Sequence, residues 1–409
     1  MNPLYVGIDV SSKNNVVYLM KPDGSKIKNF SVPNSKDGSQ TLVKEILSAI
    51  TSFSLTDLII GMEATSVYGE HLVCFLREDG SLAPFNRKIH VLNPKQVNKF
   101  KQSYNDLPKN DYVDSFVIAD CLRFGRINKE VYLDDYRYKA LQTLTRARFT
   151  TVQNLTREKQ RFMNVLFKKY SSLAQEKVLS DTFCSTALAL YEEFDSADAL
   201  AYMDLHELTA FLQEKGKNRF ANPDEIAKAI QKAARSSYRL PKTVNDSVNQ
   251  LLSLSISSIR ALESQIKQFD KAIAAQMELI PNTLTSVKGI GPVYSAGIIA
   301  EIGDINRFPD QAKLAKYAGL SWNQHQSGDF DAQNKRCIRS GNRFLKYYLG
   351  EAAMSLVRCD TEYSRFYHLK YKEVNKYQHK RALALTARKL VRLVFRLLKD
   401  NRLYIEPKA

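Results

Sequence analysis

The first third of the chain alternates short apolar runs with turns and amphipathic stretches. Short apolar runs bounded by turn residues such as Pro22-Asp23-Gly24 are typical of strands, and apolar positions repeating every three to four residues are typical of helices. The predicted strands are residues 4–10, 16–20, 27–32, 58–62 and 89–92, and the predicted helices are 40–50, 68–78, a helix beginning at Asn93-Pro94, and 111–124. This order predicts an α/β domain that extends to about residue 134.

The remainder of the chain has the periodicity of helices. Residues 135–170 predict a long polar helix, residues 171–245 predict further helices, and a 4-3 repeat beyond Pro241 predicts a coiled-coil seam of about 43 Å. The seam positions are Leu252, Ser255, Ile259, Leu262, Ile266, Phe269, Ile273, Gln276 and Ile280. Pairing within the chain, as a hairpin with residues 135–170, and pairing between protomers are both compatible with this pattern.

Length and composition agree with a globular protein of several domains. At 409 residues the chain is too long for one typical domain, and 44% hydrophobic residues exclude a disordered chain. The sequence contains no membrane-spanning apolar stretch, and its five scattered cysteines form no CxxC pair. Residues 1–4 lack the basic and apolar regions of a signal peptide, so we expect no export. We expect domains at 1–134, 135–280 and 281–409 in a cytoplasmic protein without disulfides or a zinc site.

The net charge of +17 is concentrated in the last third of the chain. Residues 281–409 carry 23 Lys and Arg against 11 Asp and Glu, whereas residues 1–134 carry 16 against 15. Positive charge gathered in one region indicates a polyanionic partner. Nucleic acid is therefore the expected partner, and nothing in the sequence indicates a membrane.

Four acidic residues stand where an RNase-H-like fold places its metal ligands. Asp9 and Glu63 each interrupt or end an apolar run, where a carboxylate is costly unless something binds it. Asp111 and Asp114 are three residues apart and share one face of a predicted helix, whereas Asp120 falls on the opposite face. Each acid alone is equally compatible with a turn or cap, but the set predicts two Mg²⁺ ions, or Mn²⁺, acting in phosphodiester chemistry.

A second candidate site surrounds Ser327 in Gln326-Ser327-Gly328. A serine hydroxyl can attack phosphorus when it is activated, and nearby cations stabilise the charge on the phosphate oxygens. The cations of the following segment are Lys335, Arg336, Arg339 and Arg343. On residue chemistry alone, a loop serine among solvated arginines is the favoured interpretation, and Ser340 competes as the serine of a Ser-Gly pair.

Two further features of the basic region indicate phosphate contacts. The turn Lys288-Gly289-Ile290-Gly291 between predicted helices resembles a helix-hairpin-helix element, whose exposed amides hold a DNA phosphate, although such turns also occur as plain connectors. Residues 380–399 predict an amphipathic helix whose charged face includes Arg388 and Lys389. That face is either solvated or bound to a phosphate backbone, and the regional charge favours the second.

Motifs along nearly the whole chain, in their order and spacing, resemble the IS-one-ten family of insertion-sequence transposases, the bridge-RNA-guided DEDD recombinases. The motifs are Gly7-Ile8-Asp9-Val10-Ser11, Met62-Glu63-Ala64-Thr65, Asn93-Pro94-Lys95, Lys109-Asn110-Asp111-Tyr112-Val113-Asp114, Gly289-Ile290-Gly291-Pro292, Gln326-Ser327-Gly328 and Ser340-Gly341-Asn342-Arg343. The chain departs from the family at Ser66, where glycine is usual, and in the length of region 171–245.

The resemblance implies a RuvC-like N-terminal domain, a coiled-coil middle and a mostly α-helical C-terminal transposase domain. It implies Mg²⁺ at Asp9, Glu63, Asp111 and Asp114, and it makes Ser327 the nucleophile, which reverses the interpretation from residue chemistry. The implied partners are donor and target DNA, a bridge RNA, and a dimer that becomes a tetramer at synapsis, in a prokaryotic cytoplasm beside the nucleoid. The residues expected to contact nucleic acid are Lys95, Lys288, Gly289, Gly291, Lys335, Arg336, Arg339, Arg343, Arg388 and Lys389.

Two rival functions stay open at this stage. One is a RuvC-like junction nuclease that uses metal-activated water, and the other is a nucleic-acid-binding scaffold whose acids are structural. The acids precede Ser327 by more than two hundred residues, with the long helical element between them. We therefore expect a composite site in which Ser327 of one protomer meets the acids of another once nucleic acid is bound.

Overall fold

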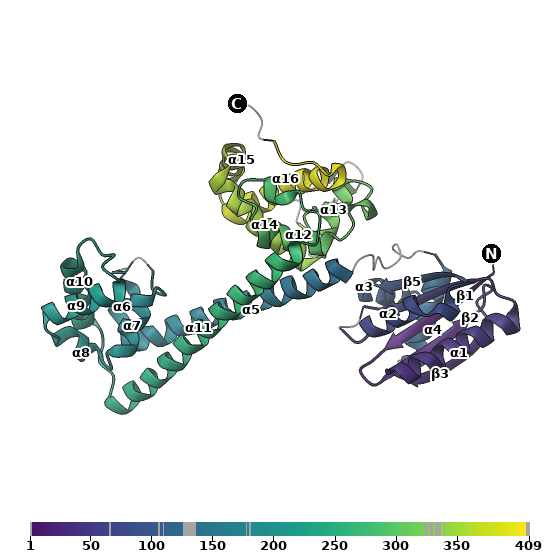
Figure 1. The fold of residues 1–409 in the computed structure, drawn as a ribbon, viewed down its shortest axis with the longest axis horizontal. Coiled ribbons are helices and arrows are strands. Elements are labelled where there is room, and N and C mark those ends of the chain that lie inside the picture. The colour runs from purple at the N-terminus through teal and green to yellow at the C-terminus, as the bar shows by residue number, and fades with distance from the viewer. Residues whose placement is uncertain are drawn as a thin grey trace. The chain divides into compact units, whose positions relative to one another are not determined.

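The computed structural model describes most of the chain, as two compact units, Met1–Leu133 and Asp134–Ala409 (Figure 1). Each unit is described by itself. The described residues are 2–64, 67–104, 107–108, 110–125, 136–176, 178–179, 181–322, 326–327, 330–331, 337–338 and 340–405, with the backbone alone at 326–327 and 330–331.

A mixed five-stranded sheet forms the centre of the first unit, in the order β3-β2-β1-β4-β5. The central strand β1 is antiparallel to β2 and parallel to β4, and β4 is parallel to β5. The strands are β1 Pro3–Val10, β2 Asn14–Met20, β3 Lys26–Pro33, β4 Asp57–Glu63 and β5 Asn86–Leu92. All five predicted strands are confirmed, and each contributes apolar residues to the cores on the faces of the sheet.

Helices cover both faces of this sheet. Leu4, Val6 and Ile8 of β1 pack with α1 and α2, while the opposite face packs with α3 and α4. The helices are α1 Lys36–Phe53, α2 Glu70–Glu78, the short 3₁₀ helix η1 Gly80–Leu82, α3 Pro94–Lys101 and α4 Asp111–Arg123. Helix α1 begins four residues before the predicted start, because Ser35 caps it by accepting a hydrogen bond from the Gly38 amide.

The position of α4 depends on two glycines in neighbouring strands. A Cβ on Gly7 would lie 2.1 Å from the Ser115 carbonyl oxygen, and a Cβ on Gly61 would lie 2.8 Å from the Leu122 side chain. Real side chains do not approach so closely, so only glycine lets the α4 backbone rest directly on β1. This contact brings the first turn of α4 to the end of β1 that carries Asp9.

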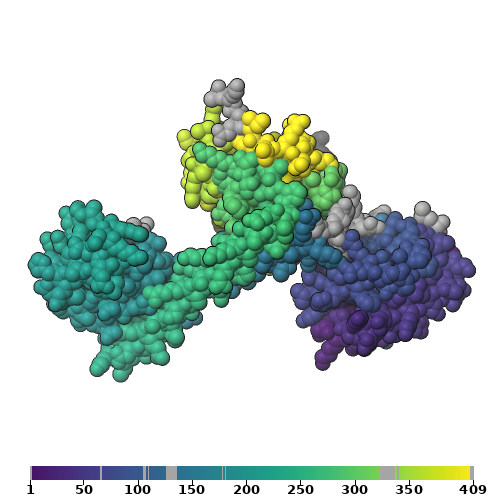
Figure 2. Space-filling model, viewed as in Figure 1, coloured from purple at the N-terminus to yellow at the C-terminus, as the bar shows by residue number. Residues whose placement is uncertain are grey.

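Two long helices, α5 Tyr136–Lys169 and α11 Lys242–Met277, form the backbone of the second unit. They lie side by side, as Figures 1 and 2 show. Arg148 pairs with Asp270 at 2.5 Å, and Glu158 accepts a hydrogen bond from Ser255 at 2.5 Å, so the helices run antiparallel. The predicted seam therefore packs within one chain, although α11 ends at Met277 and Ile280 lies beyond it.

One end of this helix pair joins a bundle of five short helices. Phe162 of α5, Tyr170 just beyond its end, and Leu252 and Ile256 of α11 are buried in a common core with that bundle. The helices are α6 Ser171–Gln175, α7 Ser185–Glu193, α8 Ala197–Tyr202, α9 Leu205–Gly216 and α10 Pro223–Ser236. Region 171–245 is thus a helical module whose hydrophobic core is completed by the ends of α5 and α11.

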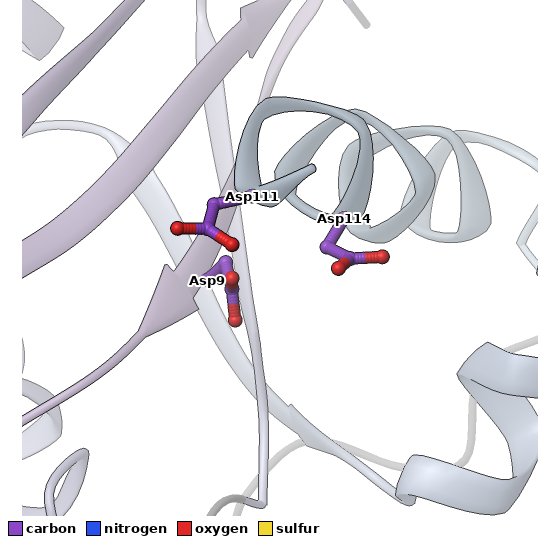
Figure 3. A group of neighbouring side chains, drawn as sticks. All are labelled: Asp9, Asp111 and Asp114. Atoms are coloured by element: carbon purple, nitrogen blue, oxygen red, sulfur yellow. The ribbon is translucent and has the colours of Figure 1, made fainter. Parts of the chain in front are cut away.

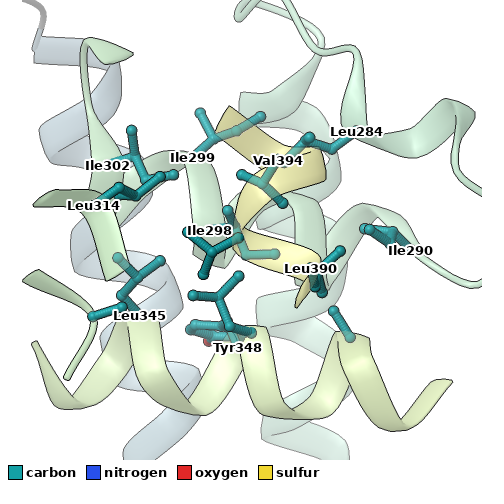
Figure 4. Packing of buried hydrophobic residues seen from close by; sticks show 14 of the residues in the cluster. Leu284, Ile290, Ile298, Ile299, Ile302, Leu314, Leu345, Tyr348, Leu390 and Val394 are labelled. Carbon is teal, nitrogen blue, oxygen red and sulfur yellow. The ribbon is translucent and has the colours of Figure 1, made fainter. Parts of the chain in front are cut away.

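The other end of the pair joins the basic C-terminal third, around a separate core that contains Ile298, Tyr348 and Leu390 (Figure 4). The elements are η2 Leu284–Ser286, α12 Pro292–Ile302, η3 Ile305–Arg307, α13 Gln311–Tyr317, β6 Gln326–Ser327, β7 Phe330–Asp331, α14 Arg343–Cys359, α15 Thr361–Lys372 and α16 Gln378–Asp400. The expected polar loop at Ser327 is instead a small antiparallel pairing of β6 with β7. No helix in the described ranges is long and apolar enough to cross a membrane.

Candidate functional site

Two of the four predicted acids lie at the same edge of the first unit's sheet. Asp9 is the penultimate residue of β1, and Glu63 is the last residue of β4. The two strands are parallel, with Ile8 opposite Met62, so the acids follow a matched pair of residues. Parallel neighbouring strands thus bring two carboxylates that are far apart in sequence to one end of the sheet.

The other two acids come from the first turn of α4. Asn110 caps this helix by accepting a hydrogen bond from the Val113 amide at 2.8 Å, and the helix begins at Asp111. Asp111 and Asp114 therefore fall within one turn, as their spacing predicted. The close contact of α4 with Gly7 places that turn over the end of β1.

The carboxylates of Asp9, Asp111 and Asp114 form a tight cluster. One oxygen from each lies within 4.8 Å of the others. Figure 3 shows Asp9 and Asp111 facing one another, with Asp114 one turn along the same helix. Glu63 is close enough to raise the pKa of Asp9 by its charge. The structure thus brings three predicted acids together, with the fourth beside them.

Mutual repulsion and burial alter the ionisation of this cluster. The pKa of Asp9 is raised to about 6, first by burial and then by the charges of Asp114, Asp111 and Glu63. The pKa of Glu63 is also raised, by burial and by Asp114. A cation bound beside the cluster would favour the ionised form of Asp9 and of Glu63.

Lys101, at the end of α3, supplies one such cation. Its ammonium lies 2.5 Å from a carboxylate oxygen of Asp114, and its charge partly offsets the rise in the pKa of Asp9 and of Glu63. Sequence reasoning missed this residue, because a lysine in a polar helix carries no distinguishing signal. Asp120, excluded by its helix face, pairs with Arg123 at 2.6 Å and accepts a hydrogen bond from Tyr104, away from the cluster.

The cluster fits a divalent metal ion. Hard cations such as Mg²⁺ prefer carboxylate oxygens, and three separate side chains here offer oxygens within reach of one ion. Polar groups flank the site in a pocket. It is lined by Asp9, Ser11, Asn14, Val16, Ser31, Asn110, Asp111 and Tyr112. One lysine cannot neutralise four carboxylates, so the donor set suits a doubly charged ion.

The predicted nucleophile lies in the second unit. The backbone of Ser327 in β6 pairs with Phe330 in β7. Ser340, the competing serine, is exposed just before α14. Three of the predicted phosphate-binding residues lie outside the described residues, namely Lys335, Arg336 and Arg339.

The turn predicted to bind phosphate has the exposure that such a role needs. Lys288 and Gly291 are exposed, and Gly291 precedes the first residue of α12. Gly289 has a φ of +101°, which a side chain rarely adopts, and it packs beside α14. The element before the turn is the 3₁₀ helix η2 rather than the expected α-helix.

The remaining predicted contacts differ in how far they are already occupied. Lys95 and Arg343 are exposed in the first turns of α3 and α14. Arg388 donates a hydrogen bond to Gln311 at 2.7 Å, and Lys389 pairs with Glu362 at 2.6 Å. These two side chains already have partners within the protein, so they are less available to a phosphate backbone.

Comparison with known protein families gives two matches. Residues 6–170 match a transposase family described as DEDD and IS110, and residues 282–368 match the family described as Transposase IS116/IS110/IS902. The two matched segments together cover more than half of the chain. The first contains all four predicted acids, and the second contains Ser327 and Ser340.

Relatives with known names extend the similarity along the whole chain. The IS116 uncharacterized 44.8 kDa protein of Streptomyces clavuligerus is 24% identical over 98% of this chain and 96% of its own length. The IS110 uncharacterized 43.6 kDa protein of Streptomyces coelicolor is 25% identical over 98% and 95%. The putative transposase for the IS117 mini-circle of Streptomyces coelicolor is 24% identical over 83% and 82%.

Proposed function

Because this chain belongs to the IS110 family of insertion-element transposases, DNA-acting enzymes, we propose that it cleaves and exchanges DNA strands through a covalent link to Ser327. In this proposal the first unit is an RNase-H-like, RuvC-like domain. Its mixed sheet with the order β3-β2-β1-β4-β5 supports this assignment, as does the placement of acids at β1, β4 and α4.

The acidic cluster is the observation that carries the phosphoryl-transfer part of the proposal. Asp9, Asp111 and Asp114 gather their oxygens within 4.8 Å, and Glu63 acts electrostatically on Asp9. A scaffold protein gains nothing from repelling carboxylates at one edge of its sheet, whereas a metal-dependent phosphoryl-transfer site uses them to hold its ions. Mg²⁺ bound there would supply positive charge where negative charge grows on the phosphate, and family membership supports divalent metal use.

The proposed chemical step exchanges one phosphoester for another. The Ser327 hydroxyl oxygen forms a bond to phosphorus while the bond from phosphorus to the leaving strand's oxygen breaks. The serine proton ends on the released hydroxyl of that strand, so no water and no external energy source is consumed. The reverse attack by a new strand end restores Ser327 and completes exchange.

The proposed partners are nucleic acids and further copies of the chain. Donor and target DNA are exchanged, a bridge RNA pairs with both, and a dimer becomes a tetramer at synapsis. The charge of the last third supports this, since residues 281–409 carry 23 Lys and Arg against 11 Asp and Glu. Lys288, Gly291 and Arg343 are the exposed described residues that we assign to phosphate contacts there.

One rival enzyme is a junction nuclease that needs no protein nucleophile. The observation in its favour is that the acidic cluster lies entirely within the first unit. In that case water attacks phosphorus, and the product end is a free phosphate. The cluster would then suffice for cleavage, and the serine segment would serve binding alone.

A cleavage assay without protease treatment separates these functions. The purified protein is incubated with Mg²⁺, element-end DNA and the RNA recovered with it from cells, and the products are resolved on a denaturing gel. DNA that migrates with protein, and is released by protease, supports the recombinase. Free phosphate ends support the nuclease, and absence of cleavage supports a binding scaffold.

A further inference from the structure

A fully buried carboxylate in the second unit lies outside both sites described above. Glu301 is in the last turn of α12, and its side chain is 0% exposed. Arg146 of α5 donates to it twice, at 2.7 and 2.9 Å. Replacing such a buried ion pair with apolar side chains is often neutral or stabilising. Packing alone therefore does not account for Glu301.

Asn342 is a further polar partner of this carboxylate. Its Nδ2 donates to Glu301 Oε2 at 2.6 Å and to the Tyr317 hydroxyl at 3.1 Å. Its Oδ1 accepts from the Phe344 and Leu345 amides at 3.0 Å each, which caps α14. Because both ends of the side-chain amide are used, its orientation is fixed. The buried carboxylate thus holds in place the residue that caps α14.

Asn342 also closes the base of the segment that contains Ser327. The Asn342 amide donates to the Tyr317 carbonyl at 2.7 Å, and the Ile338 amide donates to the Ser321 carbonyl at 2.9 Å. Trp322 and Cys337 form an antiparallel bridge. The two ends of the segment from 319 to 341 therefore lie side by side, with β6 and β7 between them in the chain.

Two glycines make this closure unusually tight. Gly319 and Gly341 have φ values of +68° and +135°. A Cβ on Gly341 would lie 2.5 Å from the Gly319 nitrogen, so the two backbones are in direct contact. Lys346 adds a hydrogen bond to the Gly319 carbonyl at 3.1 Å. The base is thus set by backbone contacts, and its position depends on what holds Asn342.

We propose that Arg146, Glu301 and Asn342 are a positioning network that fixes the base of the Ser327 segment against α5, α12 and α14. Helices α12 and α14 pack so closely that a Cβ on Gly297 would enter the Tyr348 ring, at 2.3 Å. The network therefore sits on a rigid support, which is what a nucleophile on a connecting segment requires. The inference rests on the proposed role of Ser327, and its three residues are positioning residues rather than catalytic ones.

The test exchanges donor and acceptor between two of these residues. Asn342→Asp keeps the cap of α14 but sets a carboxylate against Glu301, and Glu301→Gln removes the charge that Arg146 and Asn342 share. In the double variant, the amide introduced at position 301 donates to the carboxylate introduced at position 342. At saturating DNA we expect each single variant to lower the rate of serine–DNA adduct formation about tenfold or more, and the double variant to recover most of it. The affinity for DNA should stay unchanged in all three.

A matched control distinguishes the loss of positioning from a general loss of stability. Leu349→Ala removes a side chain that is 1% exposed in the same core but is apolar, so it forms no hydrogen bond with the network. It should lower the melting temperature at least as far as Asn342→Asp while leaving the adduct rate near that of the unaltered protein. An adduct rate that follows melting temperature across all variants, with no recovery in the double variant, overturns the proposal.

Amide hydrogen exchange tests the positioning network independently of the role assigned to Ser327. Exchange of the Ile338 and Asn342 amides should accelerate in both single variants and slow again in the double variant, with or without catalysis. Unchanged exchange overturns the positioning network, as does faster exchange with an unaltered adduct rate. If the unaltered protein forms no adduct at Ser327, the proposed function fails, while the exchange pattern still decides whether the network holds the segment.

Discussion

The acidic cluster and the Ser327 segment are built in opposite ways. The acids stand on two strand ends and on the first turn of a helix that touches the sheet backbone at Gly7. Ser327 stands on a two-residue strand within a long connection between α13 and α14. The first site takes its geometry from regular elements, whereas the second depends on contacts at the base of its segment.

This difference separates two kinds of sequence signal. A carboxylate at the end of an apolar strand is costly unless something binds it, so Asp9 and Glu63 can be recognised from the sequence as candidate ligands. A serine in a polar connection is ordinary, and residue chemistry alone did not favour Ser327. The two sites should therefore lose activity for different reasons. The acidic cluster should be sensitive to a change in its charge, and Ser327 should be sensitive to a change in the contacts at the base of its segment.

Removing one acid should have the largest effect. Asp9→Asn and Asp111→Asn each replace a carboxylate with a weaker ligand, so we expect DNA cleavage to fall by at least ~1,000-fold with nucleic-acid binding retained. Cleavage rates and gel-shift affinities measure this. Asp37→Asn, another exposed acid in the first turn of a helix, is the matched control and should cleave normally. Normal cleavage by Asp9→Asn would remove the cluster from the reaction.

A methyl group at Gly7 should disrupt the acidic cluster indirectly, by displacing helix α4. The added Cβ would lie 2.1 Å from the Ser115 carbonyl oxygen, so α4 must shift and carry Asp111 with it. We expect Gly7→Ala to cost about 2–3 kcal/mol in unfolding free energy and to weaken metal binding. Gly80→Ala, where a Cβ meets nothing within 4 Å, should stay within about 0.5 kcal/mol in chemical denaturation. Equal stabilities would show that the α4 contact is not tight.

Metal binding should depend on pH through Asp9. Its pKa of about 6 means that a proton must leave before the carboxylate can bind a cation. Mn²⁺ affinity, measured by calorimetry, should rise about tenfold per pH unit below 6 and level off above about 7. Without metal the sign reverses: the folded state holds this proton more tightly than the unfolded state, so stability falls as pH rises from about 4 to 6. Metal affinity that is flat from pH 5 to 7 would contradict this.

The smallest expected effect is the partial DNA-cleavage activity that two inactive variants regain when they are mixed. If Ser327 acts with the acids of another protomer, a mixture of Ser327→Ala and Asp9→Ala contains dimers with one intact site. Half of randomly formed dimers are mixed, so activity should reach up to about a quarter of the unaltered value. Oligomer exchange is confirmed by differently tagged chains. No recovery in confirmed mixed oligomers would place both sets of residues on one chain.

The sequence predicted the scaffold of the acidic site better than its details. Strand runs and their order predicted the five-stranded sheet, and helical spacing put Asp111 and Asp114 on one turn. Lys101 could not be found, since its pairing with Asp114 exists only in three dimensions. Glu301 did carry the same signal as Asp9, an acid interrupting the apolar run Ile298-Ile299-Ala300, yet it was overlooked. The pairing of β6 with β7 lies in too short a stretch for any periodicity to show.

Mapping the covalent linkage shows whether Ser327 becomes joined to DNA. The protein is trapped on element-end DNA, digested with protease and nuclease, and the peptide that carries a nucleotide is sequenced by mass spectrometry. We expect a phosphodiester at Ser327 that is absent from the Ser327→Ala variant and from Asp9→Asn. A linkage at Ser340, or cleaved DNA without any linked peptide, would contradict it.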